Sequence, residues 1–91
     1  MRITVVGGGR MGLPLACTFA RHGARVTVSD IDRALVKQLE EGRCPYEEPG
    51  LAALVTSMHS EGRLRASCDT AAASAASDAI VVIVPAHLTQ D

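Results

Sequence analysis

The hydrophobic residues of this 91-residue chain follow two different spacings. Short, nearly continuous apolar runs predict buried β-strands, at about residues 2–6, 24–29, 64–67 and 79–84. Between these runs, apolar or small residues recur at helical spacing, at about residues 11–22, 33–41, 51–59 and 71–77. In the first helix, the residues expected to face the sheet are Leu15, Ala16, Phe19 and Ala20. The alternation of strands and helices indicates an α/β fold with a parallel sheet.

We predict a partial, Rossmann-like, doubly wound parallel sheet, with the four strands in the order 3-2-1-4 and right-handed crossovers between them. The helix at 51–59 is an addition between the second helix and the third strand, which a minimal unit joins in a few residues. The run at 79–84 looks the most buried, yet this order puts it at an edge. Because an apolar edge strand without proline pairs readily with other chains, we expect pairing between chains there, or a covering helix.

Three glycines follow the first strand in the pattern G-x-G-x-x-G, at Gly7, Gly9 and Gly12. Gly7 permits a tight turn, Gly9 leaves room for a pyrophosphate beside the backbone, and Gly12 lets the helix pack closely against the strand. Free N–H groups and the helix dipole then face the phosphates. The pattern alone is a weak signal, but here the strand, the helix and a downstream acid are all present. We therefore predict a dinucleotide site rather than a simple tight turn.

The downstream acid is Asp30, at the end of the second strand and 18 residues after Gly12. A carboxylate there can accept hydrogen bonds from ribose hydroxyls and repels a 2′-phosphate, which favours NAD over NADP. The alternative role for Asp30, capping the next helix, is better filled by Asp32. Arg33 complicates the choice because an arginine beyond this strand can accommodate the 2′-phosphate, although it is equally well explained as a solvated residue of the first helical turn.

The composition of the chain limits which classes of partner it can bind. The net charge is −1 and the chain has one Tyr, one Phe and no Trp, so we expect no nucleic-acid surface. The longest apolar run, at 79–86, is too short to cross a bilayer, and no signal peptide precedes the first strand. We therefore expect a cytoplasmic protein without a membrane partner. Cys17, Cys44 and Cys68 have no metal-binding spacing, so we expect no metal site and reduced, mostly buried thiols.

Longer stretches of sequence carry a more specific pattern. The segments at 5–16 and 28–32 surround the glycines and the acid. The added region reads Glu41-Gly42-Arg43-Cys44-Pro45, then Glu48-Pro49-Gly50-Leu51, then Gly62-Arg63-Leu64-Arg65-Ala66-Ser67 and Asp69. In residue identity and spacing, these segments resemble the UDP-glucose/GDP-mannose dehydrogenase family, and the resemblance covers essentially the whole chain.

The resemblance implies the NAD-binding portion of an enzyme that oxidises the C6 alcohol of a nucleotide sugar to a carboxylate. The three glycines would cradle the pyrophosphate, backbone N–H groups of Arg10 and Met11 would line its path, and Asp30 would hold the adenosine ribose. The candidate cofactor-binding residues are therefore Gly7, Gly9, Arg10, Met11, Gly12, Asp30, Ile31, Arg33, Pro85 and Ala86.

The chain departs from the family pattern at three positions. Arg10 stands where an aromatic residue is more common, Leu35 where the family usually has Lys or Arg, and Ala86 where it usually has Thr. The family's catalytic cysteine, lysine and asparagine match no residue of this chain, so the resemblance implies no catalytic residue within it.

A complete domain of this type has six strands, and this chain has room for about four. We therefore expect residues 1–91 to be the first half of a dinucleotide-binding domain, without the catalytic and nucleotide-sugar domains and inactive alone. A nucleotide sugar would then bind only to the full-length parent. Two alternatives stay open. The segment Met11-Gly12-Leu13-Pro14 is also similar to the 3-hydroxyisobutyrate and 6-phosphogluconate dehydrogenases, and a stand-alone nucleotide-binding module without chemistry also fits.

Overall fold

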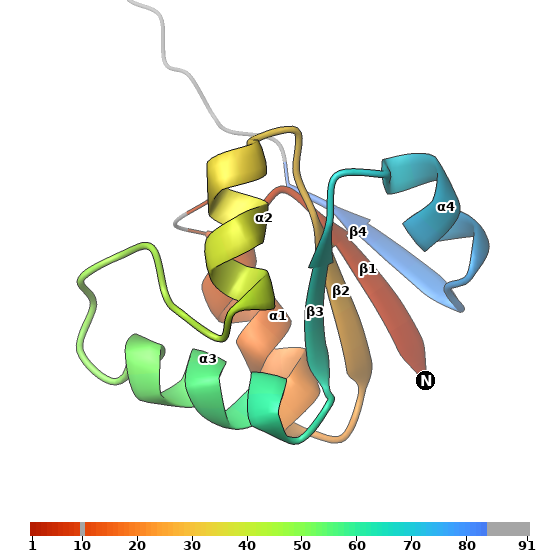
Figure 1. Cartoon of the computed structure of the whole chain (residues 1–91). Helices are drawn as coiled ribbons and strands as arrows, with labels where there is room; N and C mark the ends of the chain where they lie inside the picture. The colour runs from red at the N-terminus through yellow and green to blue at the C-terminus, as the bar shows by residue number, and fades with distance from the viewer. Residues whose placement is uncertain (10, 84–91) are drawn as a thin grey trace, which may run out of the picture.

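The computed structural model describes residues 1–9 and 11–83. Four parallel strands form a single sheet in the order β3-β2-β1-β4. Along the chain the elements are β1 (Arg2–Val6), α1 (Gly12–Arg21), β2 (Arg25–Ser29), α2 (Arg33–Glu40), α3 (Leu51–Ser60), β3 (Leu64–Ser67), α4 (Thr70–Ala75) and β4 (Ala79–Val82) (Figure 1). The predicted Rossmann-like α/β class, the strand order and the additional helix are confirmed.

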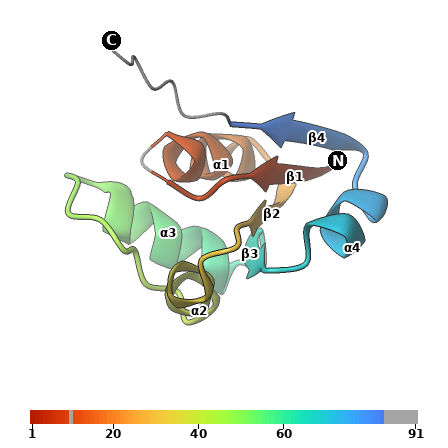
Figure 2. The same cartoon turned by 90° about the horizontal axis from the view of Figure 1, so that it is seen from above.

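The two faces of the sheet are covered unequally. The helices α1, α2 and α3 lie on one face and the short α4 on the other (Figure 2). The hydrophobic core lies on the three-helix side, where Val5, Leu13, Val28 and Leu39 are fully buried. Because alternate residues of a strand point to opposite faces, Val5 of β1 and its partner Val28 of β2 both face this core.

The buried face of α1 differs from the prediction. Leu15 and Phe19 are only half-buried, whereas Leu13 and Cys17 are fully buried together with Ala16. The helix is rotated because it begins at Gly12, which lies directly against the backbone of the glycine turn. The residues that share that side of the helix therefore enter the core, and the two larger side chains stay at its margin.

The helix α4 is held mainly by hydrogen bonds. None of its residues is buried, which confirms that this alanine- and serine-rich helix adds little apolar burial. The Thr4 hydroxyl of β1 donates to the Ala73 carbonyl (3.0 Å), and the Ser29 and Thr70 hydroxyls are hydrogen-bonded to each other. Asp69 caps the helix by accepting a hydrogen bond from the Ala72 N–H (3.0 Å). Buried hydroxyls on the strands thus fix a helix that has no apolar face.

The prediction that the last strand is the most buried is wrong. Ile80 and Val82 are 50% and 60% exposed, while Val81 and Ile83 pack against the core. Ile80 pairs with Thr4 and shares its face of the sheet, but α4 covers β1 and β2 rather than this edge. The apolar run therefore has one covered and one open face. Its predicted end at Val84 lies outside the described residues.

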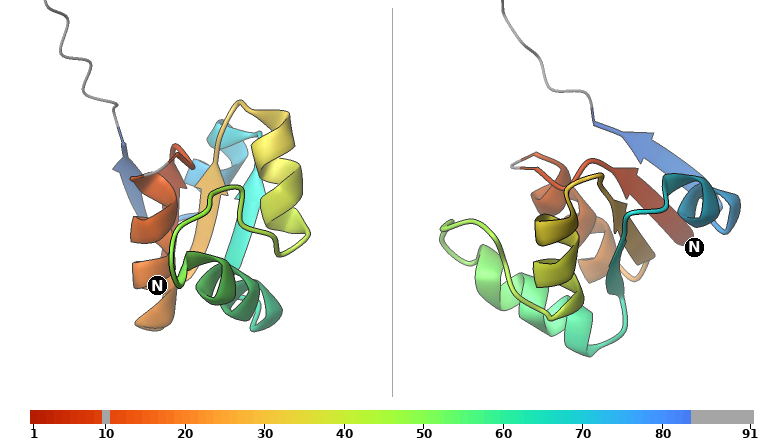
Figure 3. Two further views of the ribbon diagram at one scale, coloured as in Figure 1. Left: turned by 90° about the vertical axis from the view of Figure 1, so that its left-hand side faces the viewer. Right: turned by 45° about the horizontal axis from the view of Figure 1, so that its top comes forward.

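The segment between α2 and β3, residues 41–63, is called the insertion here. Its helix α3 contacts both α1 and α2 (Figure 3), and buries Leu51, Val55 and Met58. These apolar contacts attach the insertion to the same helical layer that covers the core.

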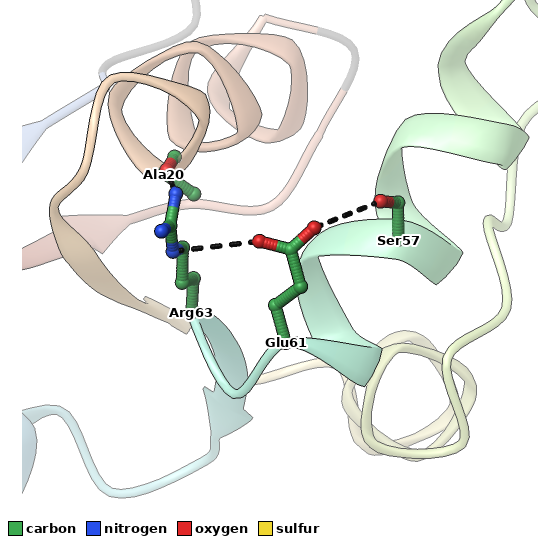
Figure 4. A network of polar contacts seen from close by, with 4 residues as sticks. All are labelled: Ala20, Ser57, Glu61 and Arg63. Carbon is green, nitrogen blue, oxygen red and sulfur yellow. Dashed lines mark hydrogen bonds and ion pairs between the residues drawn. The ribbon is translucent and has the colours of Figure 1, made fainter.

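A polar network ties the end of the insertion to α1 (Figure 4). The Arg63 guanidinium donates to the Ala20 carbonyl in the last turn of α1 (3.5 Å) and lies 3.6 Å from the Glu61 carboxylate. The Ser57 hydroxyl of α3 donates to the same carboxylate (3.3 Å). Because the side chains of Arg63 and Glu61 are 41% and 48% exposed, solvent screens the ion pair and it stabilises the fold by only about 0–1 kcal/mol.

The contact between Gly12 and Gly7 leads to a prediction. A Cβ added at Gly12 would lie 1.8 Å from the Gly7 carbonyl oxygen, whereas one at Gly9 would meet only the Tyr46 hydroxyl at 4.0 Å. We predict that Gly12→Ala lowers the free energy of unfolding by about 1–3 kcal/mol or more, because the helix must move off the strand. Gly9→Ala should cost less. Urea denaturation followed by circular dichroism tests this, and equal losses would contradict it.

Candidate functional site

Four glycines, Gly7, Gly8, Gly9 and Gly12, are called the glycine loop here; they connect the carboxyl end of β1 to the start of α1. Gly7 has φ 110°, a region that favours glycine, and its N–H donates to the Ser29 carbonyl at the end of β2 (2.7 Å). The turn therefore stays attached to the sheet while it leaves β1. Together with the close approach of Gly12, this geometry fits the roles predicted for the first and last glycines.

The surroundings of Gly9 combine open space with nearby backbone hydrogen-bond donors. The nearest atom to an added Cβ is the Tyr46 hydroxyl at 4.0 Å, so the surroundings are open. The helix α1 begins beside it, its N-cap residue Met11 makes no side-chain capping bond, and its first turn holds no acid. Uncapped N–H groups at a helix N-terminus attract phosphate and other anions. This part of the loop therefore offers a pyrophosphate both room and donors.

Asp30 connects the end of β2 to the glycine loop. One of its carboxylate oxygens accepts a hydrogen bond from the Gly8 N–H (2.8 Å), and the other accepts from the Asp32 N–H (2.9 Å). Each oxygen can accept a further hydrogen bond, and the side chain is only half-buried. Asp32 caps α2 by accepting from the Ala34 and Leu35 N–H groups (3.0 and 3.2 Å), as predicted. Asp30 is therefore free of the capping role and lies at the carboxyl edge of the sheet, where such folds bind ligands.

Two further residues surround Gly8, and sequence reasoning did not single them out. A Cβ on Gly8 would lie 2.8 Å from Val28 and 2.9 Å from Leu35, so only glycine fits here. Leu35, which stands where the resemblance expects Lys or Arg, is buried against the loop. The run of three consecutive glycines was a signal for Gly8, but nothing in the sequence indicated the contact with Leu35.

Tyr46 of the insertion also reaches the loop. Its hydroxyl donates to the Gly8 carbonyl (3.0 Å) across 38 residues of sequence. No motif predicts this contact, because it depends on how the insertion folds back over α1. The insertion thus supplies a side chain to the candidate site.

The other predicted site residues fall into two groups. Met11, Ile31 and Arg33 are exposed near the loop and Asp30, with Ile31 90% exposed. Arg33 begins α2 and forms no ion pair within the part of the chain that is described. Outside the described residues lie Arg10, Pro85 and Ala86.

A groove of about 660 Å³ lies elsewhere, beside α4 and at the amino ends of the strands. Its charged residues include Arg2, Arg25, Arg65 and Glu40. Unlike the glycine loop, the groove offers no open turn leading into a helix, so it matches a dinucleotide less well.

The cysteines differ in their surroundings. Cys17 is buried, Cys44 is half-buried and Cys68 is exposed, so the expectation of mostly buried thiols is right only for Cys17. Burial, with a contribution from nearby Cys44, raises the pKa of the Cys17 thiol to about 11. No helix within residues 1–9 and 11–83 combines the length and apolar character needed to cross a membrane.

A glycine loop after the first strand, an acid at the end of the second and a parallel sheet in the order 3-2-1-4 define a dinucleotide-binding α/β domain. Comparison with known families makes the class specific. Residues 1–91 match the NAD binding domain of the UDP-glucose/GDP-mannose dehydrogenase family. The chain belongs to this family, as the sequence resemblance implied, and its cofactor is NAD.

Individual proteins of this family are similar to the chain in sequence and in fold. The chain is 39% identical over 84 residues to the UDP-glucose 6-dehydrogenase of Rhizobium meliloti, covering 92% of this chain and 19% of that protein. Its fold matches the GDP-mannose dehydrogenase of Pseudomonas aeruginosa with a TM-score of 0.90 at 30% identity, covering 93% and 20% of the two chains. A UDP-glucose dehydrogenase from Pyrobaculum islandicum gives 0.86 at 35% identity, covering 91% and 19%. The chain thus spans about a fifth of the length of the relatives it matches.

The raised pKa of Cys17 leads to a prediction. Because the thiolate is the reactive form and the pKa of Cys17 is about 11, this buried residue stays protonated at pH 8. We predict that iodoacetamide modifies exposed Cys68 in the folded protein and reaches Cys17 only after denaturation in urea. Mass spectrometry of timed samples measures this. Modification of Cys17 as fast as that of Cys68 in the folded protein would contradict it.

Proposed function

We propose that this chain forms the adenosine and pyrophosphate half of the NAD site in a dehydrogenase that oxidises the C6 alcohol of a UDP- or GDP-sugar to the uronic acid. The central observation is that the Asp30 carboxylate bonds the Gly8 N–H directly beside the open surroundings of Gly9. The names of the relatives, UDP-glucose 6-dehydrogenase and GDP-mannose 6-dehydrogenase, support the substrate class.

The glycine loop would bind the pyrophosphate. Open space at Gly9 lets phosphate oxygens approach the backbone, and the uncapped start of α1, beside Met11, stabilises their negative charge. Gly7 and Gly12 would act indirectly, by shaping the turn and holding α1 against it. On sequence grounds we also assign Arg10, Pro85 and Ala86 to the site.

Asp30 would bind the adenosine ribose. Its carboxylate oxygens each use one backbone N–H and can accept further hydrogen bonds from ribose hydroxyls. Exposed Ile31 offers an apolar surface for the base beside it, and exposed Arg33 lies at the start of α2 where a 2′-phosphate would come near. The fixed negative charge of Asp30 favours NAD.

The chemistry itself would require more than this chain. NAD, when bound, accepts the hydride, and we assign this chain's residues only to holding the cofactor. We propose that residues 1–91 are the first half of the dinucleotide-binding domain and that the nucleotide sugar binds to other parts of the parent protein. The cytoplasmic location expected from the sequence stays a prediction.

The role of Asp30 can be tested with both cofactors. We predict that Asp30→Ala weakens NAD binding about ten-fold or more, since a hydrogen bond to a charged group contributes about 1.5–3 kcal/mol. NADP should lose less, because its 2′-phosphate no longer meets a carboxylate. Calorimetric titration measures both affinities. Asp30→Asn, which keeps the shape and one acceptor oxygen, separates the loss of charge from loosening of the loop, and equal losses for NAD and NADP would remove Asp30 from the ribose.

We also propose that chains associate through the edge of β4, where Ile80 and Val82 are exposed. Sedimentation should show a concentration-dependent dimer, and Val82→Lys should shift it to monomer because the lysine adds charge to the pairing edge. Ile31→Lys is the control, since Ile31 is also an exposed apolar residue but follows β2 and lies away from β4. A monomer at all concentrations would overturn the proposal.

A further inference from the structure

We propose that Tyr46 is a positioning residue for the cofactor site. From the insertion, it holds the peptide between Gly8 and Gly9 so that the Gly9 N–H faces the incoming pyrophosphate. This inference rests on the proposed NAD-binding function of the glycine loop, and it gives the insertion a part in that function.

Both polar backbone groups of Gly8 are fixed from distant parts of the chain. Its N–H donates to Asp30 at the end of β2 (2.8 Å), and its carbonyl accepts from the Tyr46 hydroxyl (3.0 Å). Glycine has more backbone freedom than any other residue, so the middle of a run of three glycines has little conformational preference of its own. The two bonds supply that preference.

The orientation of one carbonyl determines that of the next N–H. In a planar trans peptide the carbonyl of one residue and the N–H of the following residue point in opposite directions, and the described residues contain no cis peptide. With the Gly8 carbonyl turned toward Tyr46, the Gly9 N–H points away from that side chain. Within the described chain no acceptor bonds to the Gly9 N–H, so it is available to a ligand.

Tyr46 can act in this way because it is itself held in place. Its ring packs against the hydrophobic core, and the Cys44 thiol donates to the Tyr46 carbonyl (3.3 Å). A separate hydrogen bond in the insertion, from the Thr56 hydroxyl of α3 to the Gly42 carbonyl (2.8 Å), involves neither Tyr46 nor the glycine loop. A minimal strand–helix–strand unit has no need of the insertion for its fold, and here the insertion supports the glycine loop from outside the sheet.

Tyr46→Phe tests the proposal because it removes the hydroxyl and keeps the ring that packs on the core. We expect the Kd for NAD to rise about three- to ten-fold, the effect of losing one hydrogen bond that preorganises the loop. Hydrogen exchange at the Gly8 amide of the ligand-free protein, which its bond to Asp30 protects, should accelerate because the peptide on its other side is then less restrained.

Thr56→Val is the matched control. Like Tyr46→Phe, it removes a hydroxyl of the insertion that donates to a glycine carbonyl. The acceptor of Thr56 is Gly42, which lies in the insertion and not in the glycine loop. It should lower the thermal midpoint by a comparable amount and leave the Kd for NAD and the exchange rate of the Gly8 amide unchanged. A role of Tyr46 limited to stability predicts the same affinity for both variants.

The outcomes separate the two proposals. If the wild-type chain binds no NAD, the proposed function fails and the role of Tyr46 fails with it. If the wild type binds NAD and Tyr46→Phe binds it equally well, or if Thr56→Val weakens binding as much, only the role of Tyr46 is overturned.

Discussion

The hydrogen bond between the Gly8 N–H and the Asp30 carboxylate is the interaction on which the site depends. It joins the turn after β1 to the end of β2, residues 22 positions apart in sequence. Of the hydrogen bonds described for the loop, this one and the Gly7 bond to Ser29 tie it to β2, while the Tyr46 bond ties it to the insertion. The same carboxylate is the group assigned to the ribose. In the proposed NAD site, the Asp30 side chain would therefore serve both the structure of the loop and the recognition of the ribose, and its bond to Gly8 would place the ribose relative to the pyrophosphate.

That bond forms only because the surrounding packing allows it. A Cβ on Gly8 would meet the side chains of Val28 and Leu35, which would have to shift, whereas a Cβ on Gly12 would meet the Gly7 backbone itself. The contact at Gly12 is therefore the stricter of the two. The glycines are thus required by steric contacts on the protein side as well as by the room that a phosphate needs.

Much of the fold followed from local pattern. Apolar runs located the strands, and the Rossmann pattern with right-handed crossovers gave their order. What failed was the burial of β4 and the rotation of α1. An apolar sequence shows that Ile80 and Val82 can be covered, but whether another element covers them depends on where α4 lies. Likewise, helical spacing predicted a buried face on α1 that included Leu15 and Phe19, whereas the structure buries Leu13 and Cys17 beside Ala16 and Ala20.

The candidate site, like the fold, has residues that the sequence predicted and contacts that it did not. Asp30 and the motif glycines were predictable because strand ends of a parallel sheet meet at one edge. Tyr46 was not, because its contact with Gly8 depends on the path of the insertion.

The most direct test of the account is an amide chemical-shift map of the chain titrated with NAD. The account predicts changes at Gly8, Gly9 and Asp30, with Arg25 and Arg65 in the groove beside α4 unaffected. Changes centred on that groove, or none at NAD concentrations of several millimolar (roughly 4 kcal/mol of binding free energy), would contradict it.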